Sequence, residues 1–336
     1  MQYYLGLDAG GTKTFVLIGD AEGRILGFGR AGTGNYEGFG IDAAYREIEK
    51  AVNGALQSAG LTLDQISGIG MGIAGADLPE DYVMLEKEIF TPMFGDIPRM
   101  FRNDSMGGLR GGTKDPFGIV IACGTGCVCA GINRAGRDTR VGGISEDFGD
   151  MISGSSIGIE GLRTVFRQRD GIMPESPLTR LFVERAGLKS VDELFYKMYK
   201  REIWYDDLQP MAKLVFDAAY EGDSAACDLL EWGGRYLGDM VNAVARLLDM
   251  RRDTFDVVMT GSVFKGVSPV LMDAMTTRIH RECPNARCVR ALFEPVVGTL
   301  LLGVELHHGM DEGKYAVLTE ELDKAAQRFG VCFRPE

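Results

Sequence analysis

The sequence predicts an α/β protein of two lobes, each built round a mixed sheet. Each half opens with a strand, a glycine turn and a second strand, at Tyr3–Asp20 and again at Phe117–Asn133. Helical and strand periodicities alternate after both openings, and 336 residues suffice for two buried cores. We expect one lobe over 1–115, completed by the C-terminal helix at about 308–336, and the other lobe over 116–307.

The first lobe is expected to begin with an antiparallel meander. Apolar and β-branched residues flank the Gly10-Gly11-Thr12 turn, and a third strand, Ile25–Gly29, follows a Glu-Gly turn. A helix is predicted over Ile41–Ala59, where apolar side chains recur at helical spacing. A strand, a helix and a strand then follow at Ile66–Ile73, Glu80–Phe90 and Pro98–Phe101.

The second lobe repeats this opening and then becomes mainly helical. Strands at Phe117–Ala122 and Cys127–Asn133 flank the Gly124-Thr125-Gly126 turn, and a later strand is expected at Asp256–Gly261. The helices expected from periodicity cover Ser156–Arg169, Pro177–Ala186, Val191–Tyr199, Trp204–Glu221, Ala225–Leu248, Pro269–Cys283, Pro295–His307 and Glu320–Phe329.

Charge and hydropathy exclude several classes of protein. The net charge of -12 disfavours a general nucleic-acid binder, because like charges repel. No apolar run approaches the ~18 residues of a membrane span, and the N-terminus lacks the pattern of a signal peptide. We therefore expect a cytoplasmic protein that binds neither nucleic acid nor membrane.

The seven cysteines are expected to be reduced thiols. Three of them, Cys123, Cys127 and Cys129, crowd one segment and leave a metal or iron–sulfur role open. No nearby histidine or second cysteine pair completes a four-ligand site. Packing as small buried side chains is the favoured interpretation.

The first glycine turn has the composition of a phosphate site. In Asp8-Ala9-Gly10-Gly11-Thr12-Lys13-Thr14, the glycines allow positive φ angles and close approach of the backbone to phosphate. Successive N–H groups then form an anion-binding nest, and the threonine hydroxyls and the lysine add donors. Asp8, at the strand end, suits a magnesium ion held through water. An ordinary hairpin turn is the alternative.

The second turn, Gly124-Thr125-Gly126, is of the same kind, and two such turns could grip a triphosphate from both sides. A strand that ends at Gly261-Ser262 could let a flat base lie against the backbone, although a plain strand-to-helix turn also explains it. Asp104, at another strand end, could accept a hydroxyl proton. A helix N-cap is the alternative for this aspartate.

These four elements, in this order, resemble the superfamily of sugar kinases, heat-shock proteins and actin. The segments LGLDAGGTKTFVLI, IACGTGCVCAGI, VVMTGSVF and EPVVGTLLLGVEL carry the resemblance over nearly the whole chain. Within it, the sequence is most similar to N-acetylglucosamine kinases and BadF/BadG/BcrA/BcrD-type ATPases. The resemblance implies a duplicated actin-like (ribonuclease H-like) fold with a central ATP cleft.

The resemblance also implies roles for individual residues. The family's catalytic aspartate corresponds to Asp104 and its sugar-contacting asparagine to Asn35. The nucleotide would be held by both glycine turns and the Gly-Ser strand end, namely Gly10, Gly11, Thr12, Lys13, Thr14, Gly124, Thr125, Gly126, Gly261 and Ser262. The sugar would contact Asn35, Asp104, Thr125, Gly126, Cys127, Gly143, Ile144 and Asp150.

The implied activity is phosphoryl transfer from ATP, with Mg²⁺, to a hydroxyl of an amino sugar, N-acetylglucosamine or glucosamine. Ile144 and Met151 depart from the family pattern and make the expected sugar pocket more apolar. One alternative is an ATPase activator of an acyl-CoA dehydratase or reductase, and another is a non-catalytic sugar sensor. A small-molecule sugar is the expected partner, and a homodimer is common among such relatives.

Overall fold

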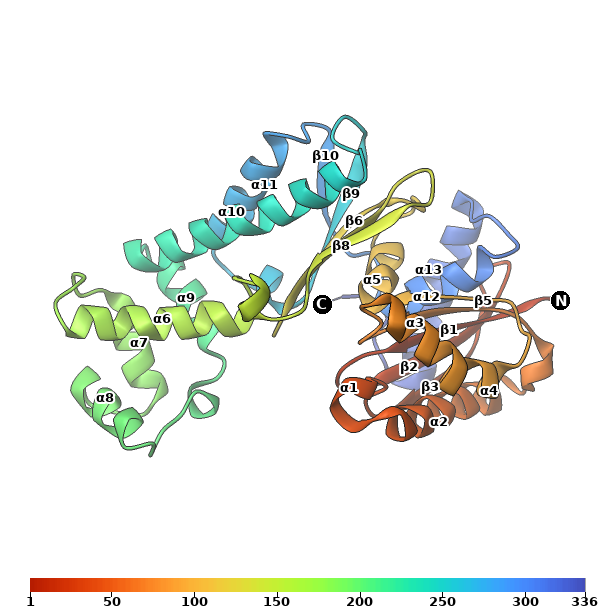
Figure 1. Ribbon diagram of the computed structural model, residues 1–336, viewed down its shortest axis with the longest axis horizontal. Coiled ribbons are helices and arrows are strands. Elements are labelled where there is room, and N and C mark those ends of the chain that lie inside the picture. Colours follow the sequence, from red (N-terminus) through yellow and green to blue (C-terminus); the bar gives the residue numbers. More distant parts are fainter. Residues whose placement is uncertain (336) are drawn as a thin grey trace. The chain divides into compact units, whose positions relative to one another are not determined.

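The computed structural model describes residues 1–335 and divides the chain into two compact units. The first unit joins Met1–Val120 to Val289–Glu336, and the second unit is Ile121–Cys288. Each unit is α/β, with helices packed on one five-stranded sheet (Figure 1). This confirms the predicted fold class. The unit boundaries differ from the expected lobes in one element, described below.

The first sheet has the strand order β3-β2-β1-β4-β5. β1 pairs antiparallel with β2 and parallel with β4, so the sheet is mixed. Its strands are β1 Tyr3–Ala9, β2 Thr14–Asp20, β3 Ile25–Ala31, β4 Ile66–Ile73 and β5 Arg99–Asn103. The helices of this unit are α1 Tyr36–Phe39, α2 Ile41–Ala59, α3 Pro79–Leu85, α4 Thr91–Phe94, α5 Asp104–Gly112, α12 Pro295–Val304 and α13 Glu312–Phe329.

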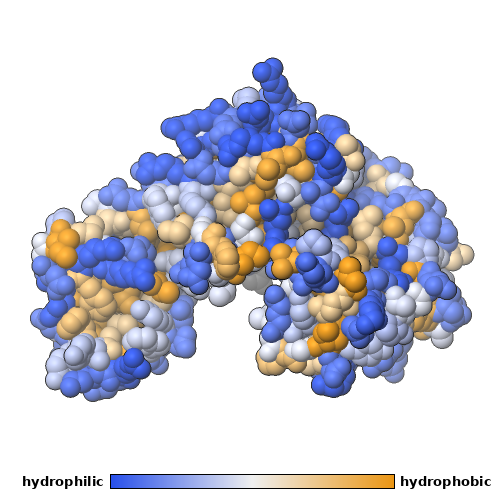
Figure 2. Space-filling view, viewed as in Figure 1, coloured by the Kyte–Doolittle hydropathy of each residue, from blue (hydrophilic) through white to orange (hydrophobic). Residues whose placement is uncertain are grey.

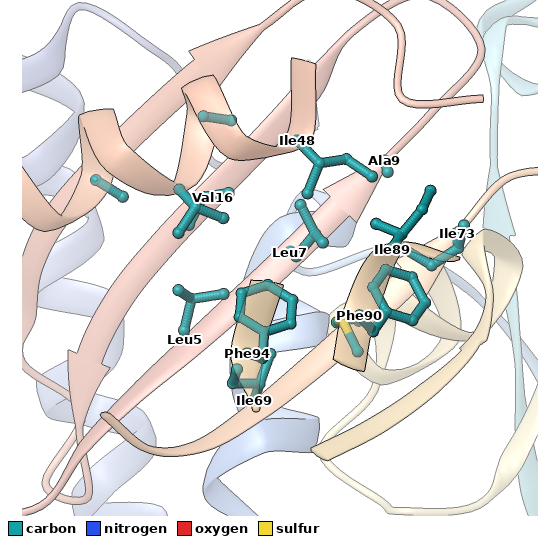
Figure 3. Close-up of a cluster of buried hydrophobic side chains, with 14 of the residues drawn as sticks. Leu5, Leu7, Ala9, Val16, Ile48, Ile69, Ile73, Ile89, Phe90 and Phe94 are labelled. Carbon is teal, nitrogen blue, oxygen red and sulfur yellow. The ribbon is translucent and has the colours of Figure 1, made fainter. Parts of the chain in front are cut away.

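Helices cover both faces of this sheet. Successive side chains of a strand point to opposite faces, so each strand contributes apolar residues to both layers. On one face, side chains of β1, β2 and β4 meet α2 and the Ile89–Phe94 segment, as Figure 3 shows. On the other face, Leu17 and Phe28 pack with residues of α12 and α13. The sheet is thus the centre of two hydrophobic layers.

α12 lies directly on the first sheet, which is why the chain returns to the first unit at Val289. A Cβ placed on Gly6 would lie 2.3 Å from the backbone nitrogen of Leu300, and one on Gly70 would lie 2.1 Å from the carbonyl oxygen of Thr299. Only glycine permits so close a crossing. The expected second lobe, 116–307, wrongly included this helix.

The second sheet has the strand order β10-β9-β6-β7-β8. Its strands are β6 Gly118–Cys123, β7 Cys127–Ile132, β8 Asp138–Gly142, β9 Phe255–Thr260 and β10 Ala286–Arg290. The helices are α6 Gly154–Arg169, α7 Pro177–Arg185, α8 Val191–Tyr199, α9 Met211–Tyr220, α10 Ser224–Leu247 and α11 Val270–His280. The long helix α10 packs on α11, and α6 packs on α9.

Most predicted elements lie where periodicity placed them, with these differences. Helices α1 and α5 were not predicted. Strands β8 and β10 were not predicted: both are short, β8 begins with an exposed aspartate, and β10 carries exposed arginines. The single helix expected over Trp204–Glu221 is interrupted, and α9 begins only after Pro210, since proline lacks the N–H that a helix interior needs. The last helix begins at Glu312, where the Asp311 side chain accepts a hydrogen bond from the backbone N–H of Lys314.

Hydrophobic residues, orange in Figure 2, also reach the surface between hydrophilic ones. Among the exposed side chains, Ile144, Phe148 and Met151 stand together in sequence just before α6. Over residues 1–335, no helix combines the length and apolar character needed to cross a bilayer.

Candidate active site

The first unit brings two carboxylates together at one end of its sheet. Asp8, near the end of β1, pairs in parallel register with Gly72 of β4. A Cβ placed on Gly72 would lie only 3.2 Å from Cα of Asp104, the first residue of α5. Since β4 also pairs in parallel with β5, the carboxyl ends of three strands meet here. Such an edge is where open α/β sheets bind ligands.

Asn103 fixes the position of Asp104. Its Oδ1 accepts a hydrogen bond from the backbone N–H of Ser105 at 3.1 Å, which caps the N-terminus of α5. Its Nδ2 donates to Oδ1 of Asp77, 2.7 Å away, which ties the cap to the loop after β4. Asp104 is therefore a half-buried carboxylate in the first turn of a helix, where the helix dipole favours negative charge.

The surroundings of Asp8 raise its pKa from 3.8 to about 7. Burial is the largest cause, and the negative charges of Asp104 and Glu294 add to it, while Lys13 opposes the shift. The positive charge of Lys13 therefore only partly compensates the ionised form of Asp8. A cation beside Asp8 would supply that charge.

A magnesium ion fits this chemistry only with partial protein coordination. Within residues 1–335, no group of three or more histidine, cysteine, aspartate or glutamate side chains could enclose a metal ion. Magnesium commonly retains several waters and takes one or two carboxylates together with substrate phosphates. Asp8 is the residue that would hold such an ion, through water as the sequence suggested.

The β1–β2 turn presents backbone to open space. The N–H of Gly10 donates to the carbonyl of Lys13 at 2.9 Å, and a Cβ placed on Gly11 would meet nothing within 4 Å. Neither glycine has the positive φ that we expected, so that detail was wrong. Glycine at position 11 is not required by packing within the protein, and its absent side chain leaves room for a ligand.

The other residues of this turn differ in accessibility. Thr12 and Lys13 are exposed, and Nζ of Lys13 lies 4.3 Å from the centre of the Phe15 ring. The Thr14 side chain is fully buried, and its Oγ1 has no hydrogen-bond partner. It points toward Gly34, whose added Cβ would lie 2.8 Å from that oxygen. A phosphate at the turn could thus reach Thr12 but not the Thr14 hydroxyl.

Asn35 belongs to the same unit and caps a short helix. Its Oδ1 accepts a hydrogen bond from the backbone N–H of Glu37 at 2.9 Å, and its Nδ2 donates to the Glu37 carboxylate at 3.3 Å. The residue remains half-buried. Its position is linked to the β1–β2 turn by Thr33, whose hydroxyl donates to the carbonyl of Gly10 at 3.1 Å.

The second unit places the other glycine turn at the N-terminus of α6. The N–H of Gly154 donates to the carbonyl of Gly124 at 2.6 Å, and a Cβ on Gly154 would lie 2.8 Å from that oxygen. Thr125 and Gly126 are exposed, and a Cβ on Gly126 would meet nothing within 4 Å. An open turn beside the positive end of a 16-residue helix suits an anion.

The Gly-Ser end of β9 lies against this turn, as the sequence suggested for an adenosine site. Gly261 has φ +102, and a Cβ there would lie 2.3 Å from the carbonyl oxygen of Cys123. The side-chain oxygen of Ser262 lies 3.9 Å from a Cβ placed on Gly124. Gly261 and Ser262 therefore lie beside the turn, and both are exposed, as are Thr125 and Gly126.

A third group in this unit joins Gly143, Ile144 and Asp150. Oδ2 of Asp150 accepts a hydrogen bond from the N–H of Ile144 at 2.7 Å. Gly143 has φ +82, and a Cβ there would lie 2.9 Å from the Val128 side chain, next to Cys127. The loop that ends at Asp150 is thereby held beside the start of β7.

The three crowded cysteines are packing residues in this structure. Cys123, Cys127 and Cys129 are buried, and Sγ of Cys127 lies 4.0 Å from Sδ of Met240. Burial raises the pKa of the Cys129 thiol, and the pKa of Cys123 is raised by a hydrogen bond with Cys127 and by burial. Cys127 can therefore offer a ligand its backbone rather than its thiol.

Three residues that contact or influence the candidate site residues were not identified from the sequence. Glu294 precedes α12 and acts on Asp8, Thr33 bridges two loops, and Gly154 positions α6 on the second turn. Two signals were available. Glu294 precedes a proline that begins a helix, and Gly154 follows Ser153, the N-cap of α6.

Comparison with known proteins identifies the family of this chain. The model of the BadF/BadG/BcrA/BcrD ATPase family matches residues 5–303. An N-acetyl-D-glucosamine kinase of Dictyostelium discoideum is 28% identical over 314 residues, covering 90% of this chain and 98% of that protein. An N-acetylmuramic acid/N-acetylglucosamine kinase of Clostridium acetobutylicum is 26% identical, with the same coverage of both chains.

Solved structures share the fold of this chain. A structure described as an N-acetylglucosamine kinase from Chromobacterium violaceum superposes with a TM-score of 0.65, at 24% identity, covering 90% of this chain and 99% of that one. A ROK family glucokinase from Streptomyces griseus gives a TM-score of 0.56 at 18% identity. The family match spans nearly the whole chain, and the chain therefore belongs to the BadF/BadG/BcrA/BcrD ATPase family.

Proposed function

We propose that the protein is an ATP-dependent kinase that transfers the γ-phosphate to a hydroxyl of an amino sugar, N-acetylglucosamine or glucosamine. One observation carries the proposal: Asp8 and Asp104 lie together at the end of a sheet whose first turn exposes an unhindered glycine. The two curated relatives named above are amino-sugar kinases that align over 90% of this chain.

The nucleotide would be held mainly by backbone groups. We assign its phosphates to the turns at Gly10–Thr12 and Gly124–Gly126, with added charge from Lys13. Gly11, Thr12, Thr125 and Gly126 are exposed and would offer their N–H groups, whereas those of Gly10 and Gly124 donate within the turns. The adenosine would lie against Gly261 and Ser262. A magnesium ion held by Asp8 would supply positive charge that neutralises the phosphates.

Asp104 would act as the general base. Its carboxylate accepts the proton of the sugar hydroxyl while the hydroxyl oxygen forms a bond to the γ-phosphorus. The bond between that phosphorus and the β–γ bridging oxygen breaks, and ADP leaves with the electron pair. Asn103 contributes by holding the first turn of α5 in place.

The sugar would be positioned by Asn35 in the first unit and by Asp150 in the second. Gly143, Ile144 and the backbone of Thr125, Gly126 and Cys127 complete the set of contacts. Oδ2 of Asp150 already accepts the Ile144 N–H at 2.7 Å, which leaves Oδ1 to accept from a hydroxyl. A carboxylate can accept more than one hydrogen bond, so both roles are compatible.

A coupled ADP-release assay tests the proposal with glucosamine, N-acetylglucosamine, glucose, muramic acids and a sample without sugar. We expect ADP release that depends on an amino sugar. Asp104→Ala should reduce the rate by at least ~100-fold, the scale for removing a general base. Rapid ADP release without any sugar would refute the kinase assignment.

Asp42→Asn is the matched control, because Asp42 is also an acidic residue in the first turn of a helix. This variant should retain the full rate.

Neither alternative activity is favoured by the relatives, which are kinases. Cytoplasmic location and a homodimer remain predictions.

A further inference from the structure

A cavity of about 490 Å³ lies within the second unit, between α6 and the first half of α10. Its apolar wall includes Met151, Ile152, Ile159, Leu229 and Trp232. Ile152 is buried, whereas Met151 is 47% exposed and Trp232 is 40% exposed. The cavity therefore has one apolar wall, and the partly exposed indole ring of Trp232 makes that wall accessible from solvent.

The wall is held in place by close packing and by a hydrogen bond. A Cβ placed on Gly233 of α10 would lie 3.2 Å from Cδ1 of Ile152, so this glycine keeps the helix against that side chain. The hydroxyl of Tyr236, one turn after Trp232, donates to the carbonyl of Gly149. The loop before α6 is thus anchored to α10 on the side of the cavity.

The cavity adjoins the proposed sugar position through this same loop. Asp150 immediately precedes Met151 and Ile152, which form part of the wall. Asp150 also holds the N–H of Ile144. The loop that carries Asp150 therefore also supplies part of the cavity wall.

The charges at the cavity favour a neutral substituent. Arg163 and Arg167 both form ion pairs with Glu160, with guanidinium-to-carboxylate distances of 3.3 and 2.6 Å. Glu146 and Asp228 also line the cavity, so three carboxylates face two guanidinium groups. An anionic substituent would meet excess negative charge, whereas an alkyl group could bury its surface against the apolar wall.

We propose that this cavity receives the acyl group of the amino sugar and that the enzyme accepts N-acyl-glucosamines with chains longer than acetyl. The proposal rests on the proposed function. Burying a methylene group in apolar surroundings improves binding by about fourfold. The specificity constant should rise accordingly as the acyl chain lengthens from acetyl to butanoyl.

The test compares N-acetyl-, N-propanoyl-, N-butanoyl- and N-hexanoyl-glucosamine with the full-length protein. kcat/KM is measured by ADP release, and the Kd of each sugar is measured by calorimetry without nucleotide. We expect about a fourfold gain in both quantities with each added methylene up to butanoyl. Ala225→Phe, which places a ring in the cavity, should flatten the series, whereas Glu231→Phe, at an exposed position of α10 that does not line it, should leave the series unchanged.

The outcomes separate this proposal from the proposed function. N-acetylglucosamine turnover with a flat or falling acyl series would overturn the cavity assignment and leave the kinase intact. A preference for N-acetylmuramic acid that is lost in Arg163→Gln would also overturn it, because the cavity would then bind an anion. Binding that strengthens with chain length, without phosphorylation of any sugar, would support the cavity and refute the kinase.

Discussion

Thr33 joins two loops of the first unit through one hydroxyl group. Its Oγ1 donates to the carbonyl of Gly10 at 3.1 Å and accepts the N–H of Asn35 at 3.2 Å. Gly34 between them is buried, and a Cβ there would lie 2.8 Å from Cβ of Ala9. The β1–β2 turn, proposed to hold phosphate, and the loop of Asn35, proposed to hold the sugar, are therefore packed against each other. Thr33 acts as a positioning residue for both.

Thr33→Val should weaken the coupling between sugar and nucleotide, because valine keeps the shape of threonine and removes the hydroxyl. The Kd of a non-hydrolysable ATP analogue is measured with and without N-acetylglucosamine. The tightening by sugar should fall about fivefold to tenfold, the value of one hydrogen bond, while Thr33→Ser keeps it. Equal tightening in Thr33→Val and the wild type would disprove the role.

The pKa of Asp8 predicts how the stability of the magnesium-free protein depends on pH. Because this acid has a higher pKa in the folded state, at about 7 rather than 3.8, the folded protein binds the proton more tightly between these values. The free energy of unfolding should therefore fall as pH rises from about 4 to about 7. Asp8→Asn should remove this contribution, and Asp42→Asn should not.

The effect of magnesium on the melting temperature gives a second test of Asp8. Since ionised Asp8 is the form that attracts the cation, magnesium should raise the melting temperature of the wild type more at pH 8 than at pH 6. Asp8→Asn should lose that difference. An unchanged magnesium effect in the variant would mean that another residue holds the ion.

At the scale of turns and helices, glycines serve two different purposes. Gly261 is required by the fold, since a side chain there would lie 2.3 Å from Cys123 and φ is +102. Gly11 and Gly126 face open space and have no positive φ. In the proposed function, the absence of a side chain at these two positions leaves the backbone open to the phosphates of ATP.

Alanine substitutions should separate these purposes. Gly126→Ala should leave the melting temperature nearly unchanged and raise the KM for ATP by about tenfold or more, because the new methyl group occupies the space assigned to phosphate. Gly261→Ala should lower the stability by about 1–3 kcal/mol. Thermal denaturation and ATP kinetics on both variants provide the comparison, and a large loss of stability in Gly126→Ala would contradict the assignment.

Local sequence patterns predicted those elements whose own side chains define a periodicity. α2 matches its expected range, Ile41–Ala59, because its apolar residues recur along one face. β10, with the sequence ARCVR, was missed because its arginines interrupt the apolar pattern by which strands are recognised. Among the site residues, Asp8 and Asp104 could be identified from their strand ends. The burial of Thr14 could not, because it depends on Gly34, which follows a separate strand.

At the scale of the whole chain, the first unit is closed by its C-terminal segment. The sequence predicted α12 as a helix but did not show which sheet it covers, because both sheets offer apolar faces. Its position depends on Gly6 and Gly70, far away in sequence. Arg110 of α5 then binds Glu305, just after α12, at 2.6 Å and also contacts the Tyr315 hydroxyl of α13.

The Arg110–Glu305 pair should matter far more than an exposed pair nearby. Arg110 is 4% exposed and Glu305 23%, whereas Lys114 and Glu312, also 2.6 Å apart, are 50% and 82% exposed. Glu305→Gln leaves a buried guanidinium without its counter-ion and should cost about 2–3 kcal/mol. Glu312→Gln should cost less than about 1 kcal/mol.

Hydrogen exchange measured by mass spectrometry can locate the effect. In Glu305→Gln, amides of α5, α12 and α13 should exchange faster than in the wild type, because these elements lose their common ion pair. Trp204 and Trp232 both belong to the second unit, so tryptophan fluorescence during urea unfolding reports that unit as an internal reference. Equal losses of stability in Glu305→Gln and Glu312→Gln would show that the buried pair does not secure the C-terminal segment.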